Sequence, residues 1–159
     1  MRLFVVILII LGSCTSTVGT SIVSISNRQL LVNHTPYVIK GICYHPVPKG
    51  SNKRSFDNLT DDLALMVEAG INTIRVYEPI SEKAVLDEID AAGLKVIIGF
   101  GYNQGENLDI LSGTFIDYIN AFKTHPAILF WELGNEYNYH PEWFSGDIKN
   151  WYTALNKAA

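Results

Sequence analysis

Strand-like and helix-like segments alternate along most of this chain, and this alternation constrains its fold more than any other feature. Short apolar runs that suit buried strands are followed by amphipathic stretches with helical spacing. The strand-like runs are Tyr37–Tyr44, Ile71–Tyr77, Leu94–Phe100 and Ala127–Phe130, and the helical stretches are Phe56–Ala69, Glu82–Ala92, Phe115–Phe122 and one from about Asp147. Strands that are apolar on both faces are typical of parallel sheets covered by helices, so the pattern predicts parallel βαβ units.

Two architectures are consistent with such units, the closed TIM (β/α)₈ barrel and the open doubly wound sheet. No Gly-x-Gly-x-x-Gly run follows the first predicted strand and no phosphate loop is present, which disfavours a nucleotide-binding open sheet. Polar residues instead collect at the end of each predicted strand, namely His45, Arg75 with Glu78, Tyr102 with Asn103, and Asn135 with Glu136. Barrel enzymes collect functional groups in this way at the carboxyl ends of their strands, so we expect the barrel.

The number of predicted units is half of what a complete barrel requires. We find four strand–helix units in 159 residues, whereas a TIM barrel has eight units and roughly 250 residues. We therefore expect residues 37–159 to form the N-terminal half of such a barrel, truncated after about the fourth unit. Residues 21–36 contain β-like runs separated by a polar break at Ser26-Asn27-Arg28, which predicts a short β-hairpin ahead of the barrel.

The first twenty residues are typical of an export signal. Arg2 is followed by the apolar run Leu3–Leu11 and then by small residues, and this run is too short to span a membrane. Leu11-Gly12-Ser13-Cys14 resembles the bacterial lipoprotein box. Two outcomes are open, lipidation of Cys14, which would attach the protein to a membrane, or ordinary cleavage a few residues later. We expect an exported protein, either periplasmic, an outer-membrane lipoprotein or extracellular.

Charge and residue spacing exclude several other functions. The formal net charge is −4 and no basic block is present, which disfavours a nucleic-acid partner. The spacing of the histidines predicts no metal site, and no cofactor is expected. Cys43 lies inside an apolar run, so we expect a buried structural thiol without a disulfide partner.

Glu136 is the best candidate for a general acid/base. It follows the apolar run Ala127–Phe130 within Trp131–Asn138, where a buried strand would end. Cleavage of a glycosidic bond requires a carboxylic acid that protonates the departing oxygen and a second carboxylate on the other side of the sugar. The adjacent Asn135 could hold a sugar hydroxyl. Glu132 lies roughly 13 Å further back along a strand, so we interpret it as a paired structural carboxylate.

Arg75 is the candidate cation of the site. The alternation of the predicted strand places Ile74 and Val76 on one face and Arg75 on the other, which directs Arg75 into the barrel if its neighbours meet the helices. A buried guanidinium requires an anionic partner. This partner is either a catalytic nucleophile kept ionised by the positive charge, or a structural carboxylate such as Glu132 or Glu78.

Further polar and aromatic residues beyond the predicted strands are candidates for binding a sugar. They are His45, Tyr102, Asn103, Tyr139 and Trp143. Each has a structural alternative, because His45 could cap a loop and Trp143, near the start of a helix, could belong to the core. His125 precedes its strand and should lie at the opposite, non-catalytic end, where we expect it to pack.

The segment from His125 to Glu136 resembles the fourth-strand signature of the clan A glycoside hydrolases, which share a (β/α)₈ barrel. Its form, with His-Pro ahead and Leu-Gly-Asn-Glu behind, is most similar to the catalytic domain of glycoside hydrolase family 2. Gly41–His45 resembles the first strand of that family, and Thr73–Arg75 resembles its second. Gly41–Tyr44 with Thr73–Tyr77 is also similar to the fungal-type β-1,3-glucanosyltransferases, so the subfamily stays open.

This resemblance implies an exported retaining β-glycosidase acting on a poly- or oligosaccharide, with Glu136 as acid and then base and Arg75 supporting the nucleophile. The sequence departs from the pattern of family 2 at two points. Cys43 stands where family 2 members usually carry Asn, and the nucleophile should come from a seventh strand that lies beyond the four predicted here. We therefore expect the 159-residue chain to be almost inactive alone and to associate through its open sheet edge. The rival interpretation is a non-catalytic or degenerate carbohydrate-binding protein that keeps Arg75, Asn135 and the aromatic residues as a sugar cleft.

Overall fold

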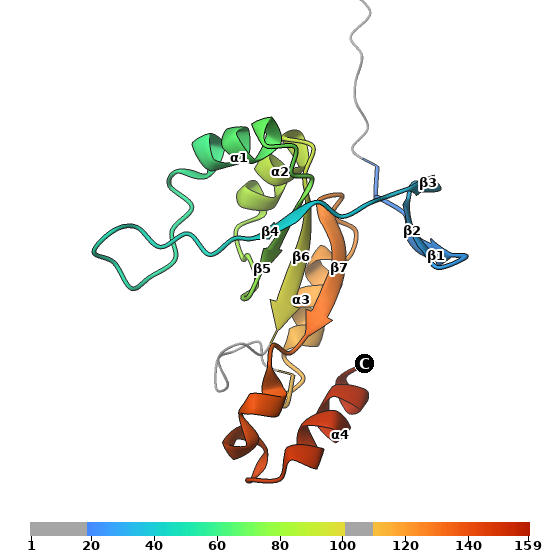
Figure 1. The fold of residues 1–159 in the computed structure, drawn as a ribbon, viewed down its shortest axis with the longest axis vertical. Coiled ribbons are helices and arrows are strands. Elements are labelled where there is room, and N and C mark those ends of the chain that lie inside the picture. Colours follow the sequence, from blue (N-terminus) through green and yellow to red (C-terminus); the bar gives the residue numbers. More distant parts are fainter. Residues whose placement is uncertain (1–18, 101–109) are drawn as a thin grey trace, which may run out of the picture.

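The centre of the molecule is a parallel sheet of four strands. The computed structural model describes residues 19–100 and 110–159. The strands follow one another in sequence order, β4 (Gly41–Cys43), β5 (Thr73–Val76), β6 (Lys95–Phe100) and β7 (Ile128–Leu133). Their carboxyl ends all lie at the same edge of the sheet (Figure 1). The predicted parallel α/β arrangement is therefore confirmed, and within the described residues the sheet does not close into a barrel.

Three helices cover one face of this sheet, and each connects two successive strands. They are α1 (Leu59–Glu68), α2 (Lys83–Ala91) and α3 (Phe115–Phe122). Gly70 and Gly93 follow the first two helices with φ of +76° and +78°, a left-handed conformation that favours glycine and ends a helix. The buried side chains of the three helices are Leu59, Leu63, Leu86, Ile89, Phe115 and Tyr118.

The main hydrophobic core lies between these helices and the sheet. Ile74 and Val76 of β5 are fully buried there, as are Val96 and Ile98 of β6. Arg75 lies between the two buried β5 residues and faces the other side of the sheet, where it contacts polar groups. The predicted alternation along β5 is confirmed.

A small antiparallel sheet lies on the face opposite the helices (Figure 1). It contains β1 (Val23–Ser26), β2 (Gln29–Val32) and a third strand that we did not predict, β3 (Thr35–Pro36). Val32 packs against Ile97 and Leu129 of the parallel sheet. This sheet therefore covers the amino-terminal part of the inner face and leaves the carboxyl ends of the strands open.

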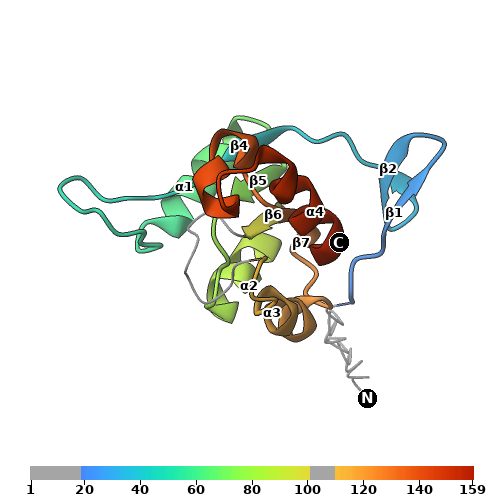
Figure 2. The ribbon, with the colours of Figure 1, turned by 90° about the horizontal axis from the view of Figure 1, so that it is seen from below.

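The chain after β7 forms three short elements beyond the carboxyl ends of the strands (Figure 2). Two are 3-10 helices that the sequence did not predict, η1 (Tyr137–Tyr139) and η2 (Pro141–Phe144). The third is the expected helix α4 (Ile148–Ala158), whose N-cap Asp147 accepts a hydrogen bond from the Lys149 backbone N–H at 2.9 Å. No helix in the two described ranges has both the length and the apolar character that a membrane span requires.

The first strand of the parallel sheet differs from its prediction. Only Gly41–Cys43 of the expected run pairs as a strand, and the Cys43 thiol is exposed rather than buried. Within the described residues β4 pairs with β5 alone, so no strand covers its other edge. Ile42 on β4 and Phe130 on the other edge strand, β7, are exposed as well.

Several predictions fall outside the described residues. Residues 1–18 include the expected signal segment with Cys14, and residues 101–109 include Tyr102 and Asn103. The export signal, the lipidation of Cys14 and the sugar-binding roles of Tyr102 and Asn103 stay predictions.

Candidate active site

The side chain of Arg75 organises a polar cluster at the carboxyl ends of β5 and β7. Its Nε donates to Oε2 of Glu132 at 2.6 Å, and its Nη2 donates to Oε1 of Glu132 at 2.8 Å. Nη2 also donates to Oδ1 of Asn135 at 2.8 Å. The side chains of Arg75 and Glu132 are 23% and 32% exposed, so this ion pair is only partly screened by solvent. The carboxylate beside it raises the pKa of Arg75, which stays charged.

A glycine on the intervening strand allows this ion pair to form. Arg75 is on β5 and Glu132 is on β7, so the bridge crosses over β6, a span of about 9.5 Å between strand axes. Gly99 of β6 pairs in register with Glu132. A Cβ atom at Gly99 would lie 3.5 Å from Oε2 of Glu132 and only 3.0 Å from the carbonyl oxygen of Val76. The absence of a side chain therefore opens the path between the guanidinium and the carboxylate.

Tyr77 extends the cluster toward the first strand of the parallel sheet. The guanidinium carbon of Arg75 lies 4.5 Å from the Tyr77 ring centroid, a cation–π arrangement. The His45 ring meets Tyr77 edge-on at 6.4 Å between centroids. The pKa of the Tyr77 hydroxyl is raised, mainly by a hydrogen bond with the Cys43 thiol and secondly by burial. Through Tyr77, the structure brings the predicted residue His45 to the edge of the cluster.

Glu136 follows the cluster in a turn with a left-handed backbone. Gly134 has a φ of +82° and Glu136 has a φ of +52°. A Cβ atom at Gly134 would lie 3.1 Å from the Tyr137 ring, so only glycine lets the turn pack this closely. The Glu136 side chain is exposed, and no hydrogen bond or ion pair holds its carboxylate within the described residues. A carboxylate in this situation is accessible to a ligand.

The two predicted aromatic residues lie in the short helices after this turn. Tyr139 is 71% exposed in η1. Trp143 in η2 stacks on His140, with 4.0 Å between ring centroids and 8° between ring planes, and it meets Tyr137 edge-on. Trp143 is thus partly buried against the main core, which favours the structural alternative for this residue, while Tyr139 presents an open ring.

The opposite end of the sheet carries a different polar cluster. His125 is buried, its Nδ1 accepts a hydrogen bond from the backbone N–H of Ala127 at 3.2 Å, and its Nε2 lies 3.1 Å from Oδ1 of Asp87. The expected packing of His125 at this end is confirmed. Lys95, the first residue of β6, forms an ion pair with Asp90 nearby, with an N–O distance of 3.1 Å.

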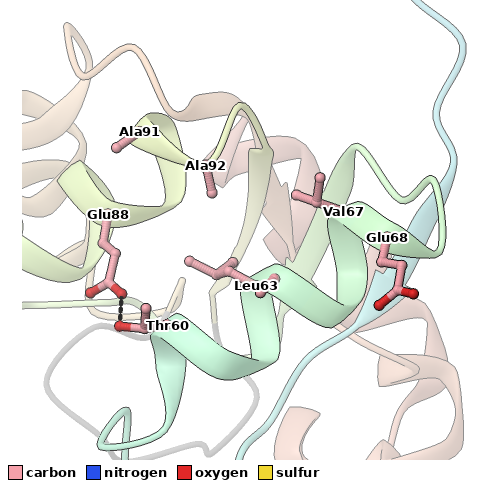
Figure 3. Close-up of a pocket in the computed structure, with 8 residues that line it drawn as sticks. Thr60, Leu63, Val67, Glu68, Glu88, Ala91 and Ala92 are labelled. Atoms are coloured by element: carbon pink, nitrogen blue, oxygen red, sulfur yellow. Dashed lines mark hydrogen bonds between the residues drawn. The ribbon is translucent and has the colours of Figure 1, made fainter.

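A groove on the outer face of the helix layer is separate from the Arg75 cluster. It has a volume of about 590 Å³ between α1 and α2, and a hydrogen bond from Thr60 to Glu88 closes one end (Figure 3). Its lining includes no residue of the cluster. Among the residues that the structure describes, no three His, Cys, Asp or Glu side chains form a group that could hold a metal ion.

The structure identifies the anionic partner of Arg75 and shows which residues of the cluster the sequence analysis missed. The partner of Arg75 is Glu132 and not Glu78, in agreement with the prediction that Glu132 is a paired carboxylate. Gly99 was not singled out, although a glycine inside a buried strand is a known indication of close approach by another group. Asn135 was expected as a residue that binds a sugar hydroxyl, but its contact with Arg75 joins residues 60 positions apart and has no sequence signal.

Comparisons with known proteins agree with this architecture. The model of the family described as "Glycosyl hydrolases family 2, TIM barrel domain" matches residues 23–157. A β-galactosidase of Psychromonas ingrahamii is 25% identical over 132 residues, which cover 75% of this chain and 13% of that protein. A β-glucuronidase of Rattus norvegicus is 26% identical over 136 residues, which cover 77% of this chain and 20% of that protein. The chain thus spans a fifth or less of the length of these relatives.

Solved structures show the same relationship. A β-glycosidase from Bacteroides vulgatus is 26% identical with a TM-score of 0.59, over 75% of this chain and 17% of that chain. A family 2 β-galacturonidase from Eisenbergiella tayi, solved with bound galacturonate, is 22% identical with a TM-score of 0.59, over 87% of this chain and 26% of that chain. At 22% identity, the likeness to the β-galacturonidase establishes the fold alone.

Proposed function

Because this chain belongs to the TIM-barrel domain family of the family 2 glycosyl hydrolases, we propose that it carries the acid/base side of a retaining β-glycosidase site. The proposed substrate is a β-linked poly- or oligosaccharide. One observation carries the proposal: Arg75, Glu132 and Asn135 meet at the carboxyl ends of β5 and β7, directly ahead of the exposed Glu136. This is the end of the sheet at which barrel enzymes perform their chemistry.

Each residue has a distinct proposed role. Glu136 protonates the departing glycosidic oxygen and then removes a proton from the attacking water, and its accessible carboxylate supports this role. Asn135 binds a sugar hydroxyl. Arg75 supplies a fixed positive charge beside the reacting centre, where it would favour an ionised carboxylate on the substrate side. His45 and Tyr139 are proposed to contact the sugar from the two sides of this cluster.

The second carboxylate is proposed to come from outside the cluster described above. A retaining mechanism needs a nucleophile about 5–5.5 Å from the acid/base. Glu132 is held by two hydrogen bonds from Arg75 and is not available for attack. The 159-residue chain should therefore show little or no turnover by itself. Export through residues 1–20, with lipidation or cleavage near Cys14, belongs to the same proposal and rests on the sequence alone.

A titration of the chain with simple sugars tests the proposal. We expect methyl β-D-galactopyranoside or methyl β-D-glucuronide to shift the NMR signals of Asn135 and Glu136 in a saturable way. Replacing Asn135 by Ala should weaken this binding about tenfold, because a sugar hydroxyl loses its partner. The matched control Glu142→Gln changes an exposed carboxylate in η2 and should leave the affinity unchanged. A titration without shifts at Asn135 and Glu136 would contradict a sugar site here.

Turnover of the corresponding p-nitrophenyl glycosides tests the catalytic part. Any hydrolysis should fall about 10²–10⁴-fold in Glu136→Gln and stay unchanged in Glu142→Gln. Efficient hydrolysis that depends on Glu136 would show that the chain holds a complete site, against the expectation of a missing nucleophile. Saturable binding without turnover supports either a partial enzyme site or the rival carbohydrate-binding function. One observation favours that rival function: both oxygens of Glu132 are bound to Arg75.

A further inference from the structure

We propose that Glu132 is a positioning residue, which acts through Arg75 to fix the side-chain amide of Asn135 in one orientation. In that orientation Asn135 presents its NH₂ group, a hydrogen-bond donor, to a sugar hydroxyl on the side away from Arg75. The part of this inference that concerns sugar binding rests on the function proposed above, whereas the orientation of the amide does not.

The first step is the fixing of the guanidinium. Two parallel hydrogen bonds, from Nε at 2.6 Å and from Nη2 at 2.8 Å, join Arg75 to the two oxygens of Glu132. Such a paired arrangement sets the plane of the guanidinium as well as its distance, which a single point charge does not. The Tyr77 ring lies 4.5 Å from the guanidinium carbon and supports one face of that plane. The Nη2 group is thereby aimed at Asn135.

The second step is the fixing of the amide. Oδ1 of Asn135 accepts a hydrogen bond from Nη2 of Arg75 at 2.8 Å. A guanidinium has only donors, so an amide rotated by 180° would bring its NH₂ group against another N–H and lose the bond. The Nδ2 group must therefore lie on the side away from Arg75. No residue of the described ranges accepts a hydrogen bond from the NH₂ group of Asn135, so both of its N–H groups can meet a ligand or water.

The third step is the space that makes the chain of contacts possible. Gly99 lies between Arg75 and Glu132, where a Cβ would already be 3.5 Å from Oε2 of Glu132, so a larger side chain would meet the carboxylate. The three residues Glu132, Arg75 and Asn135 come from two strands and a turn, and each is joined to the next by a hydrogen bond of 2.8 Å or less. A group placed against the NH₂ side of Asn135 must accept hydrogen bonds, as the oxygen of a sugar hydroxyl does and an ammonium group does not.

The experiment follows the side-chain amide of Asn135 by NMR in the ligand-free chain. In the unmodified protein, the order parameter of its Nδ2 group should be that of a rigid group, about 0.8 or more. We expect Glu132→Gln to lower it to about 0.6 or less, because the uncharged amide holds the guanidinium less firmly and Asn135 then changes orientation. Glu142→Gln, the same change at an exposed carboxylate, should leave the Asn135 signals as they are. Arg75→Lys keeps the positive charge but cannot form the two parallel hydrogen bonds to Glu132. It should change the Asn135 signals in the same way, and it provides the test if Glu132→Gln does not fold.

A double-mutant cycle separates positioning from a merely structural role. We expect Glu132→Gln to weaken the binding of methyl β-D-galactopyranoside about tenfold in the unmodified chain, and less than about twofold when Asn135 is already Ala. Unchanged Asn135 signals in a folded Glu132→Gln or Arg75→Lys variant would overturn the inference, and so would additive effects in the cycle. If the unmodified chain binds no sugar, the proposed function fails, while the ligand-free spectra still decide whether Glu132 positions Asn135.

Discussion

The two ends of the parallel sheet each carry a half-buried ion pair, but the pairs use their hydrogen bonds differently. At the amino end, Nζ of Lys95 donates to Asp90 at 3.1 Å, to the carbonyl oxygen of Pro126 at 2.7 Å and to Ser21 at 3.2 Å. An ammonium has three donors, so this group is satisfied completely by its own chain. The Lys95 cluster therefore ties the N-terminal segment to the sheet.

At the carboxyl end, the Arg75 cluster leaves donors for another molecule. Nε and Nη2 of Arg75 donate to Glu132 and Asn135, and Nη1 lies 3.8 Å from the Cys43 sulfur. The NH₂ group of Asn135 has no hydrogen-bond partner within residues 19–100 and 110–159. A satisfied cluster stabilises the fold, and a cluster with donors left over can bind a ligand. We therefore expect the Lys95 cluster to contribute stability and the Arg75 cluster to bind the proposed ligand.

Matched replacement of the two cations gives the largest expected effect. Arg75→Met and Lys95→Met should each lower the free energy of unfolding by about 1–3 kcal/mol, because each leaves a half-buried carboxylate without its partner. Only Arg75→Met should also weaken the binding of methyl β-D-galactopyranoside, by about tenfold or more. Urea unfolding and NMR titration measure the two quantities. If Lys95→Met reduced sugar affinity as strongly, the contrast between the two ends would be wrong.

A side chain at Gly99 should break the Arg75 cluster without touching its charges. In Gly99→Ala, the added Cβ would lie 3.0 Å from the Val76 carbonyl oxygen and 3.5 Å from Glu132, so we expect a loss of about 1–3 kcal/mol of stability together with weaker sugar binding. Gly70→Ala is the control. It adds a methyl group in open space at a φ of +76°, which should cost roughly 1–2 kcal/mol of backbone strain and leave sugar binding intact.

The smallest expected effect is a loss of stability in acid at the amino end. The side chains of Lys83 and, second, His125 hold the pKa of Asp87 below its ordinary value of 3.8. A carboxyl group whose pKa is lowered by folding contributes stability above its unfolded pKa, and this contribution is lost as the pH falls through the lower, folded value. As the pH falls below about 4, urea midpoints should therefore fall further for the unmodified chain than for Asp87→Asn. Equal acid dependence of the two proteins would refute this, and added salt should shrink the difference.

Sequence reasoning predicts the parallel sheet well because its signals are local. Apolar runs and helical spacing identify β5, β6, β7 and the four α-helices of the described residues, and Gly70 and Gly93 mark helix ends. The burial of Cys43 was predicted wrongly because burial depends on what covers a strand, and β4 has one neighbouring strand in the part of the chain that the structure describes. The η1 and η2 helices were missed because their turns are stabilised by ring packing among Tyr137, Trp143 and Phe144, which is not visible as a period.

The candidate site is predicted in part. Strand alternation places Arg75 on the inner face, and its need for an anion left a catalytic nucleophile, Glu132 and Glu78 as possible partners, of which the structure shows Glu132. The contact between Arg75 and Asn135 is different, because it joins residues 60 positions apart and depends on the exact path of the chain after Gly134. No pattern in the sequence encodes that path, so the fixed amide emerges only from the folded geometry.

The exposed thiol of Cys43 gives this molecule a built-in attachment point for a spectroscopic probe. Its sulfur lies 3.8 Å from Nη1 of Arg75 and is the only cysteine sulfur in the described ranges. With Cys14 changed to Ser, a maleimide-linked nitroxide or fluorophore would report directly from the rim of the Arg75 cluster. The spectrum of such a label would follow occupancy of the cluster in real time, without any new cysteine being introduced into the sheet.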